Sequence, residues 1–254
     1  MGCNTYIKRL GVVDSTNRYA RELASELWAA AANQRAVAVT AEYQTAGRGQ
    51  RGNSWTSHNG CNLLMSILVR PGAALCVANQ FMLSQAVSLA MHRAMKECGI
   101  DVRLKWPNDI YVGDRKLAGI LVELDCMGMY VEQAVIGIGL NVNQMDFPAM
   151  DRVPVSMKML IGEDVSIDDV LTLVLESFEY YYDMLINGNG EQLASEYASL
   201  LLGLGEVRRF IDSNGEFMAV IVGVEPTGEL ILRRGNGLMS RYMFKEVEQP
   251  MTGI

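Results

Sequence analysis

Hydrophobic and polar positions divide the first hundred residues into alternating strand and helix patterns. Residues 5–13 and 35–43 are predicted as strands, and the nearly continuous apolar run over 61–69 is typical of a buried strand. Between the first two strands, apolar residues recur at i, i+3, i+4 and i+7, as in an amphipathic helix. A longer apolar stripe predicts a helix over 77–98 that ends at Gly99.

A β-hairpin is predicted next, because Gly113-Asp114 is a favoured two-residue turn. Glycine supplies the positive φ that the first position of a type II′ turn needs. The implied register pairs Val112 with Arg115, Tyr111 with Lys116, Ile110 with Leu117, and Asp109 with Ala118. Diagonal neighbours lie within reach of a long side chain, so the turn aims Lys116 and Asp109 at one space. An exposed cross-strand ion pair remains the structural alternative.

Residues 117–124 and 130–143 are predicted as paired strands, and the second carries glycines on one face. Alternation places Gly137, Gly139 and Asn141 together. Glycines inside a strand mark the close approach of a ligand or another backbone, although a helix packing against them explains the pattern equally well. Helices are predicted from about 166 to 186 and up to about 202. Beyond 203, turn signals at regular spacing predict a small β-barrel.

Composition narrows the functional classes. Half of the 254 residues are hydrophobic, the net charge is −7 and the pI is about 5.0, which argues against a dedicated nucleic-acid binder. Five scattered cysteines without a CxxC pair, and only two histidines, indicate neither a zinc site nor a disulfide framework. We find no signal peptide or membrane-spanning run. We therefore expect a cytoplasmic protein without nucleic-acid or membrane partners.

Two polar stretches are candidates for binding. Ser15-Thr16-Asn17 offers more capping groups than one helix needs, so redundant capping and binding of a polar ligand both remain open. The loop over 44–62 carries four glycines, Arg48, Arg51 and Trp55, and its backbone amides and guanidinium groups suit a phosphate or carboxylate. Its Gly-x-Gly-x-x-Gly string matches the dinucleotide fingerprint, but no helix is predicted to open at Gly52, so we reject a Rossmann site.

These strings together resemble the biotin protein ligases, also called biotin–[acetyl-CoA-carboxylase] ligases. The resemblance covers nearly the whole chain. It rests on Ser15-Thr16-Asn17, Glu42-Tyr43-Gln44-x-x-Gly47-Arg48-Gly49-x-x-Gly52 with Trp55, Lys105-Trp106-Pro107-Asn108-Asp109, Arg115-Lys116-Leu117-Ala118-Gly119-Ile120-Leu121-Val122-Glu123, and Gly137-Ile138-Gly139-Leu140-Asn141. Each string alone is weak, but all five in this order are specific.

The resemblance implies an α+β fold related to class II aminoacyl-tRNA synthetases. A mixed sheet flanked by helices would form a catalytic domain over 1–202, followed by an SH3-like barrel over 203–254. It also implies an enzyme that makes biotinyl-5′-AMP from biotin and ATP, then transfers biotin to a lysine of a biotin carboxyl carrier protein or domain. Magnesium would be carried largely by the ATP phosphates, without a dedicated protein cage.

The resemblance also implies roles for individual residues. Lys116 and Arg48 would neutralise developing charge. Asp109 would orient Lys116 or the ribose–phosphate region and, as a weaker hypothesis, act as a base. The biotin-binding set would be Ser15, Thr16, Asn17, Gln44, Gly47, Arg48, Gly49, Gln50, Lys116 and Gly119. The ATP- and adenylate-binding set would be Arg48, Arg51, Trp55, Lys105, Asn108, Asp109 and Asn141.

The sequence departs from the family in two places. The family's glycine loop usually reads Gly-Arg-Gly-Arg, but Gln50 stands at the second arginine here and Arg51 follows. We expect Gln50 or Arg51 to substitute for that arginine and the adenylate to be held somewhat less tightly. Some members carry an N-terminal helix-turn-helix and act as repressors, whereas we expect a monofunctional ligase. The closest rival is a lipoate or octanoate ligase or transferase, and a biotin sensor without catalysis is the second. The oligomeric state stays open, with a homodimer among the options.

Overall fold

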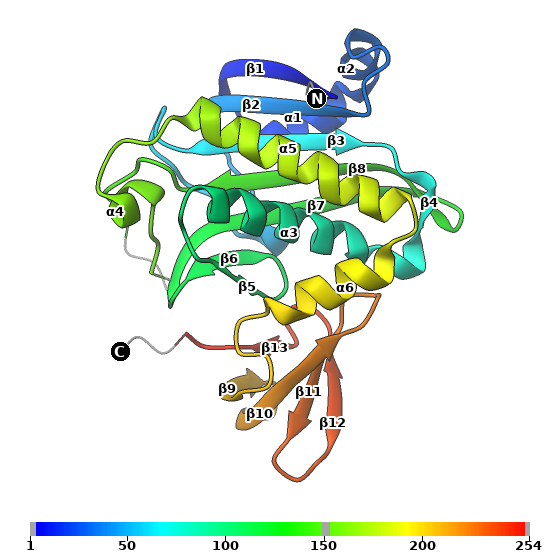
Figure 1. Ribbon diagram of the computed structural model, residues 1–254, viewed down its shortest axis with the longest axis vertical. Helices are drawn as coiled ribbons and strands as arrows, with labels where there is room; N and C mark the ends of the chain where they lie inside the picture. The colour runs from blue at the N-terminus through cyan, green and yellow to red at the C-terminus, as the bar shows by residue number, and fades with distance from the viewer. Residues whose placement is uncertain (1–3, 149–152, 252–254) are drawn as a thin grey trace.

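An eight-stranded mixed sheet forms the body of the protein in a computed structural model that describes residues 4–148 and 153–251 (Figure 1). The strands are β1 Thr5–Val13, β2 Ala36–Gln44, β3 Leu63–Val69, β4 Gly72–Cys76, β5 Arg103–Lys105, β6 Asp109–Val112, β7 Arg115–Met127 and β8 Tyr130–Leu140. Their order is β1-β2-β3-β8-β7-β6-β5, with β4 paired to β8. Strands β1 and β2 are parallel and the other neighbours are antiparallel, which makes the sheet mixed as expected.

Helices cover both faces of this sheet because successive strand residues point to opposite sides. One face packs against α3 Phe81–Glu97 and α5 Ile167–Ile186, which lie in front of the sheet in Figure 1. Helix α6 Gly190–Ser199 packs against these two helices. The other face packs against α1 Thr16–Glu22 and α2 Ala24–Ala30. A short helix, α4 Met157–Ile161, follows β8. The part of the chain that the structure describes holds no helix with the length and apolarity needed to cross a bilayer.

The helix predictions are confirmed in outline and adjusted at their ends. The apolar stripe after residue 15 forms two helices, because Leu23 leaves the helical conformation at φ −103° and ψ 20°. The long helix begins at Phe81 after a 3₁₀ turn, and Gly99 follows its end with the positive φ expected of a helix stop.

The β6–β7 hairpin has the predicted turn but not the full predicted register. Gly113 has a φ of 57°, and Val112 pairs with Arg115 and Tyr111 with Lys116 as predicted. Beyond these pairs the prediction is wrong, since Ile110 pairs with Ala118 and Asp109 with Gly119. Leu117 is therefore an extra, bulged residue on β7.

Long-range hydrogen bonds explain this bulge. The Lys116 N–H donates to Val153 O at 2.8 Å, and its carbonyl accepts from Val155 N–H at 2.9 Å. The Leu117 carbonyl accepts from Asn141 N–H at 3.0 Å. The backbone at the bulge thus bonds to residues outside β6, which a two-strand register cannot anticipate.

A second sheet follows near the C-terminus, below the main sheet in Figure 1. Its strands are β9 Val207–Asp212, β10 Gly215–Val224, β11 Leu230–Arg234, β12 Met239–Tyr242 and β13 Val247–Glu248. They form an antiparallel path in the order β12-β11-β10-β9-β13, which is open among the described residues, so closure into a barrel stays a prediction.

Candidate active site

A cavity of about 840 Å³ opens on the sheet face that carries α1. Its walls come from the start of α1, the 44–62 loop, strands β6 to β8 and the C-terminal sheet. The predicted site residues that line it are Ser15, Thr16, Asn17, Gln44, Arg48, Gly49, Gln50, Trp55, Lys105, Asn108, Asp109, Lys116, Gly119 and Asn141. Gly47 is not among the lining residues, and the side chain of Arg51 lies outside the described part of the structure.

Two paired glycines form the floor of the cavity, and Trp55 lies on them. Gly119 on β7 pairs with Gly139 on β8. A Cβ added to Gly139 would lie 2.4 Å from Trp55 Cε2, and one added to Gly119 would lie 3.2 Å from Trp55 Cζ3. The Trp55 indole N–H is buried without a hydrogen-bond partner among the described residues. The predicted close approach at the glycines is therefore made by a loop side chain that keeps an unused donor.

Gly137 leaves room for helix α1 rather than for the 44–62 loop. A Cβ there would lie 2.3 Å from Asn17 Oδ1, so the absence of a side chain lets α1 approach β8. The structural alternative, that a helix packs against the glycine, is confirmed at this position. Gly47 is likewise explained by the loop itself, since its Cβ would lie 2.3 Å from the Trp55 carbonyl oxygen.

The groups at the start of α1 form one hydrogen-bonded cluster with β2 and β3. Ser15 caps the helix, and the Thr16 N–H donates to Gln44 Oε1 at 2.7 Å. Ser66 Oγ lies 2.8 Å from Thr16 Oγ1 and donates to Asn17 Oδ1 at 2.5 Å. Sequence reasoning missed Ser66, although it is the one polar residue in an otherwise apolar strand. The polar side chains at the start of α1 are therefore not surplus capping groups, because they form hydrogen bonds with β2 and β3.

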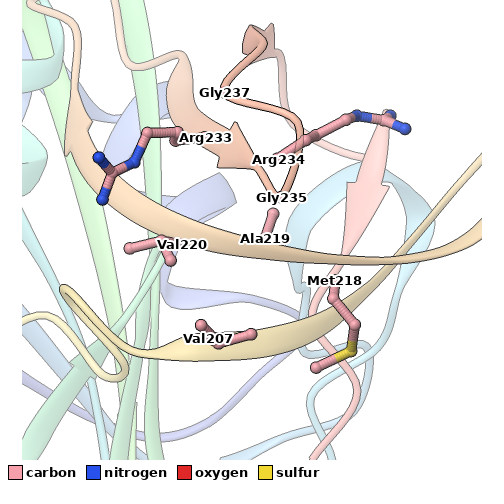
Figure 2. A pocket seen from close by; sticks show the side chains of 8 residues that line it. All are labelled: Val207, Met218, Ala219, Val220, Arg233, Arg234, Gly235 and Gly237. Atoms are coloured by element: carbon pink, nitrogen blue, oxygen red, sulfur yellow. The ribbon is translucent and has the colours of Figure 1, made fainter.

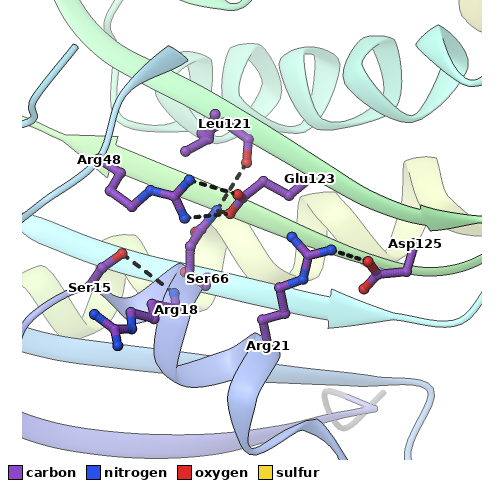
Figure 3. A network of polar contacts seen from close by, with 9 residues as sticks. Ser15, Arg18, Arg21, Arg48, Ser66, Leu121, Glu123 and Asp125 are labelled. Atoms are coloured by element: carbon purple, nitrogen blue, oxygen red, sulfur yellow. Dashed lines mark hydrogen bonds and ion pairs between the residues drawn. The ribbon is translucent and has the colours of Figure 1, made fainter. Parts of the chain in front are cut away.

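The same cluster continues to an acidic residue that sequence reasoning also left without a role. Asn17 Nδ2 donates to Glu123 Oε2 at 2.9 Å, and the Arg48 guanidinium lies 3.1 Å from Glu123 Oε1 (Figure 3). Glu123 stands four residues beyond Gly119 on β7. Arg48 and Lys116 therefore lie toward different ends of the cavity floor rather than side by side.

Lys116 and Asp109 meet as the hairpin predicted. Lys116 Nζ lies 2.7 Å from Asp109 Oδ1, with the lysine side chain 20% exposed and the aspartate 5% exposed. This pair is too buried for the alternative of an exposed surface ion pair. Lys116 Nζ also lies 5.6 Å from the centre of the Trp55 ring, above the Gly119 end of the floor. The structure thus directs a cation into the cavity and anchors it with a buried carboxylate.

Three other predicted residues hold neighbouring segments together. The Asn108 amide donates to the Ile120 carbonyl, and Asn141 Nδ2 donates to the Val155 carbonyl at 3.2 Å. Lys105 is buried, with its Nζ 5.8 Å from the centre of the Tyr111 ring. Contacts of these residues with a nucleotide stay predictions.

The C-terminal sheet supplies a wall that sequence reasoning did not foresee. Phe244 and Lys245 line the cavity together with Glu248 and other nearby residues. Trp106 connects this wall to the main sheet, because its indole N–H donates to Gly228 O at 2.9 Å and its ring centre lies 5.4 Å from that of Phe244. Turn spacing in the sequence says nothing about where the second sheet docks.

A smaller cavity of about 290 Å³ lies on the C-terminal sheet (Figure 2). Val207, Met218 and Val220 line it, and the consecutive residues Arg233 and Arg234 point in opposite directions beside it. None of the predicted site residues belongs to this cavity, so the larger one is the candidate active site.

Known proteins resemble this chain over most of its length. The model of the biotin/lipoate A/B protein ligase family matches residues 10–141. The bifunctional ligase/repressor BirA of Bacillus subtilis is 32% identical over 91% of this chain and 70% of that protein. A biotin–[acetyl-CoA-carboxylase] ligase of Paracoccus denitrificans is 32% identical over 88% of this chain and 92% of its own length.

Among solved structures, a biotin protein ligase from Aquifex aeolicus in complex with biotin and ATP superposes with a TM-score of 0.78. It is 25% identical and covers 96% of this chain and 99% of its own. The matched region contains α1, the glycine loop and the paired glycines of the cavity floor. The chain belongs to the biotin/lipoate A/B protein ligase family.

Proposed function

We propose that this protein is a biotin protein ligase, which activates biotin with ATP as biotinyl-5′-AMP and transfers the biotinyl group to a lysine of a carrier protein. The observation that carries the proposal is the Lys116–Asp109 pair, which presents a cation over the Gly119 end of the cavity floor. The Paracoccus denitrificans relative is a biotin–[acetyl-CoA-carboxylase] ligase, and the Aquifex aeolicus structure is a complex with biotin and ATP.

In the first step, the biotin carboxylate attacks the α-phosphorus of ATP, and the bond to the β-phosphate oxygen breaks as pyrophosphate leaves. Two anions must approach each other, so a fixed cation lowers the barrier by neutralising charge that accumulates in the transition state. Lys116 supplies that cation. Asp109 holds its ammonium group at 2.7 Å and thereby fixes its direction.

In the second step, the amine of the acceptor lysine attacks the acyl carbon, AMP leaves as the carbon–oxygen bond to phosphate breaks, and an amide forms. The amine must lose a proton in this step. We assign Asp109 the orientation of Lys116, and its use as a base stays a hypothesis.

The cluster at the start of α1 favours biotin over lipoate as the substrate. A ureido ring has two N–H donors and one carbonyl, which match hydroxyl and amide partners such as Thr16, Asn17 and Gln44. These residues all line the cavity. A dithiolane ring offers no such groups, so it could not form the hydrogen bonds with this cluster that a ureido ring can form.

Pyrophosphate exchange into ATP tests the proposal. Exchange should require biotin and should not proceed with lipoate at the same concentration. Exchange with lipoate alone would favour the lipoate ligase, and biotin binding without any exchange would favour the sensor. Transfer of labelled biotin to a carrier-domain fragment then tests the second step.

The remaining expectations follow from this proposal. Magnesium would arrive with the ATP phosphates, since Mg²⁺ keeps most of its water and uses substrate oxygens. Asn108, Asn141 and Lys105 would contact the nucleotide. We also propose a catalytic domain over 1–202 and an SH3-like barrel over 203–254, a cytoplasmic location, a biotin carboxyl carrier as partner and no nucleic-acid partner. A homodimer remains to be tested by sedimentation.

A further inference from the structure

Glu123 on β7 binds two residues that belong to the proposed substrate site. Its carboxylate lies 3.1 Å from Arg48 Nη2 and accepts a hydrogen bond of 2.9 Å from Asn17 Nδ2. The Glu123 side chain is 15% exposed, whereas that of Arg48 is 50% exposed. A carboxylate buried to this degree needs compensating partners, and these two contacts supply them. Figure 3 shows Arg48 directed at Glu123 across the strand.

The contact keeps Arg48 away from the reacting centre. Glu123 and Gly119 lie on the same face of β7, four residues apart, which corresponds to about 13 Å along a strand. Lys116 Nζ lies over Gly119, 3.2 Å from where its Cβ would be. For Arg48 and Lys116 to act on one carboxylate–phosphate junction, the Arg48 guanidinium must leave Glu123.

Asn17 connects this contact to the other end of the substrate. Its Oδ1 accepts from Ser66 at 2.5 Å, and its Nδ2 donates to Glu123. The carboxylate accepts only, which fixes the orientation of the Asn17 amide. Asn17 Nδ2 also donates a longer hydrogen bond of 3.5 Å to the Leu121 carbonyl. A ring carbonyl that accepts from Asn17 Nδ2 therefore competes with Glu123 or with Leu121 for its two hydrogens. Both partners of Glu123 are groups that the substrate would recruit.

We propose that Glu123 is a positioning residue that holds Arg48 in the free protein and releases it when the substrate binds. The inference rests on the proposed function, because it takes the substrate to be a carboxylic acid with a polar ring. Binding exchanges one carboxylate for another at Arg48, so Glu123 lowers the affinity for the substrate while it keeps the guanidinium at the edge of the cavity.

Replacing Glu123 by glutamine isolates the charge. The amide oxygen of glutamine still accepts from Asn17, but the pairing with Arg48 loses its ionic component. The matched control is Asp125→Asn, two residues along the same strand, where Asp125 pairs with Arg21 of α1 (Figure 3). Both variants remove one negative charge from the same face of β7, but only the first removes it from Arg48.

The first measurement is calorimetric titration of biotin without ATP. Glu123→Gln should bind biotin about two- to five-fold more tightly than the wild type, which is the range expected when a partly exposed ion pair no longer competes. Asp125→Asn should match the wild type. The gain should disappear when Glu123→Gln is combined with Arg48→Met. Equal or weaker binding by Glu123→Gln would overturn the inference.

The second measurement needs no substrate and so separates the two proposals. Trypsin should cut after Arg48 several times faster in Glu123→Gln than in the wild type or Asp125→Asn, because the guanidinium is no longer held. Equal cleavage rates would contradict the role of Glu123. A wild type that fails to bind biotin would instead count against the proposed function.

Discussion

Replacement of Lys116 by methionine separates the catalytic role of this residue from its structural role. Methionine keeps an unbranched side chain but removes the cation that lies 2.7 Å from Asp109. Removing one partner of a buried ion pair costs about 3–5 kcal/mol in unfolding free energy. Because the Lys116 side chain is still 20% exposed, we expect a smaller loss, about 2–3 kcal/mol. Urea denaturation measures it.

The effect on activity should be larger than stability explains. Loss of a fixed charge-stabilising group reduces kcat by about 10²–10³-fold in comparable sites. The assay is biotin-dependent pyrophosphate exchange, measured without urea at a temperature where the variant is fully folded. A variant that keeps exchange within ten-fold of the wild type would refute the assignment of Lys116 as the charge-stabilising residue.

The double variant Lys116→Met, Asp109→Asn is the decisive control. It removes both charges, so no buried carboxylate is left facing a lost cation, and most of the unfolding free energy should return. Activity should remain as low as in the single variant. Recovery of both stability and exchange would show that the pair only supports the fold.

Three further predictions concern other parts of the molecule. Gly139→Ala places a Cβ 2.4 Å from Trp55 Cε2, so we expect a loss of about 1–3 kcal/mol and a red-shifted tryptophan emission, with Gly11→Ala, whose Cβ meets nothing within 4 Å, as the unchanged control. Gln50→Arg should slow the release of biotinyl-AMP in single turnover, and equal release would contradict the idea that this loop position retains the adenylate. Burial lowers the pKa of His92 from its ordinary value of 6.5, so the unfolded chain binds a proton more readily than the folded one. The free energy of unfolding should therefore fall as the pH drops below about 6.5. In urea midpoints measured from pH 5 to 7.5, His92→Phe should show a weaker pH dependence than the wild type.

Local patterns in the sequence predicted the elements well. Alternation identified the strands, and Gly113 and Gly99 have the positive φ values that their turn and helix-stop roles require. The glycines of β8 correctly indicated a close approach. The alternating pattern could not show which residues contact these glycines. Asn17 contacts Gly137 and Trp55 contacts Gly139, and they come from segments about eighty to 120 residues away.

Long-range contacts account for what the sequence could not predict. The bulge at Leu117 depends on hydrogen bonds with residues 141, 153 and 155, and the C-terminal wall depends on Trp106 reaching Gly228. The pairing of Arg48 with Glu123 could not be predicted either. Glu123 belongs to a motif of the family, but nothing in the neighbouring sequence indicates which residue its side chain contacts. Most of the predicted site residues line one cavity, but the contacts between them come from tertiary packing.

Formation of the adenylate is the decisive experiment for the proposed activity of this protein. The wild-type protein, mixed with biotin and α-labelled MgATP but no acceptor, should accumulate about one equivalent of biotinyl-AMP, as expected for a single activating site. Addition of a carrier domain should then convert that adenylate to AMP and biotinylated carrier. If no biotinyl-AMP forms, this cavity does not activate biotin. If it forms equally in Lys116→Met, Lys116 is not the charge-stabilising residue.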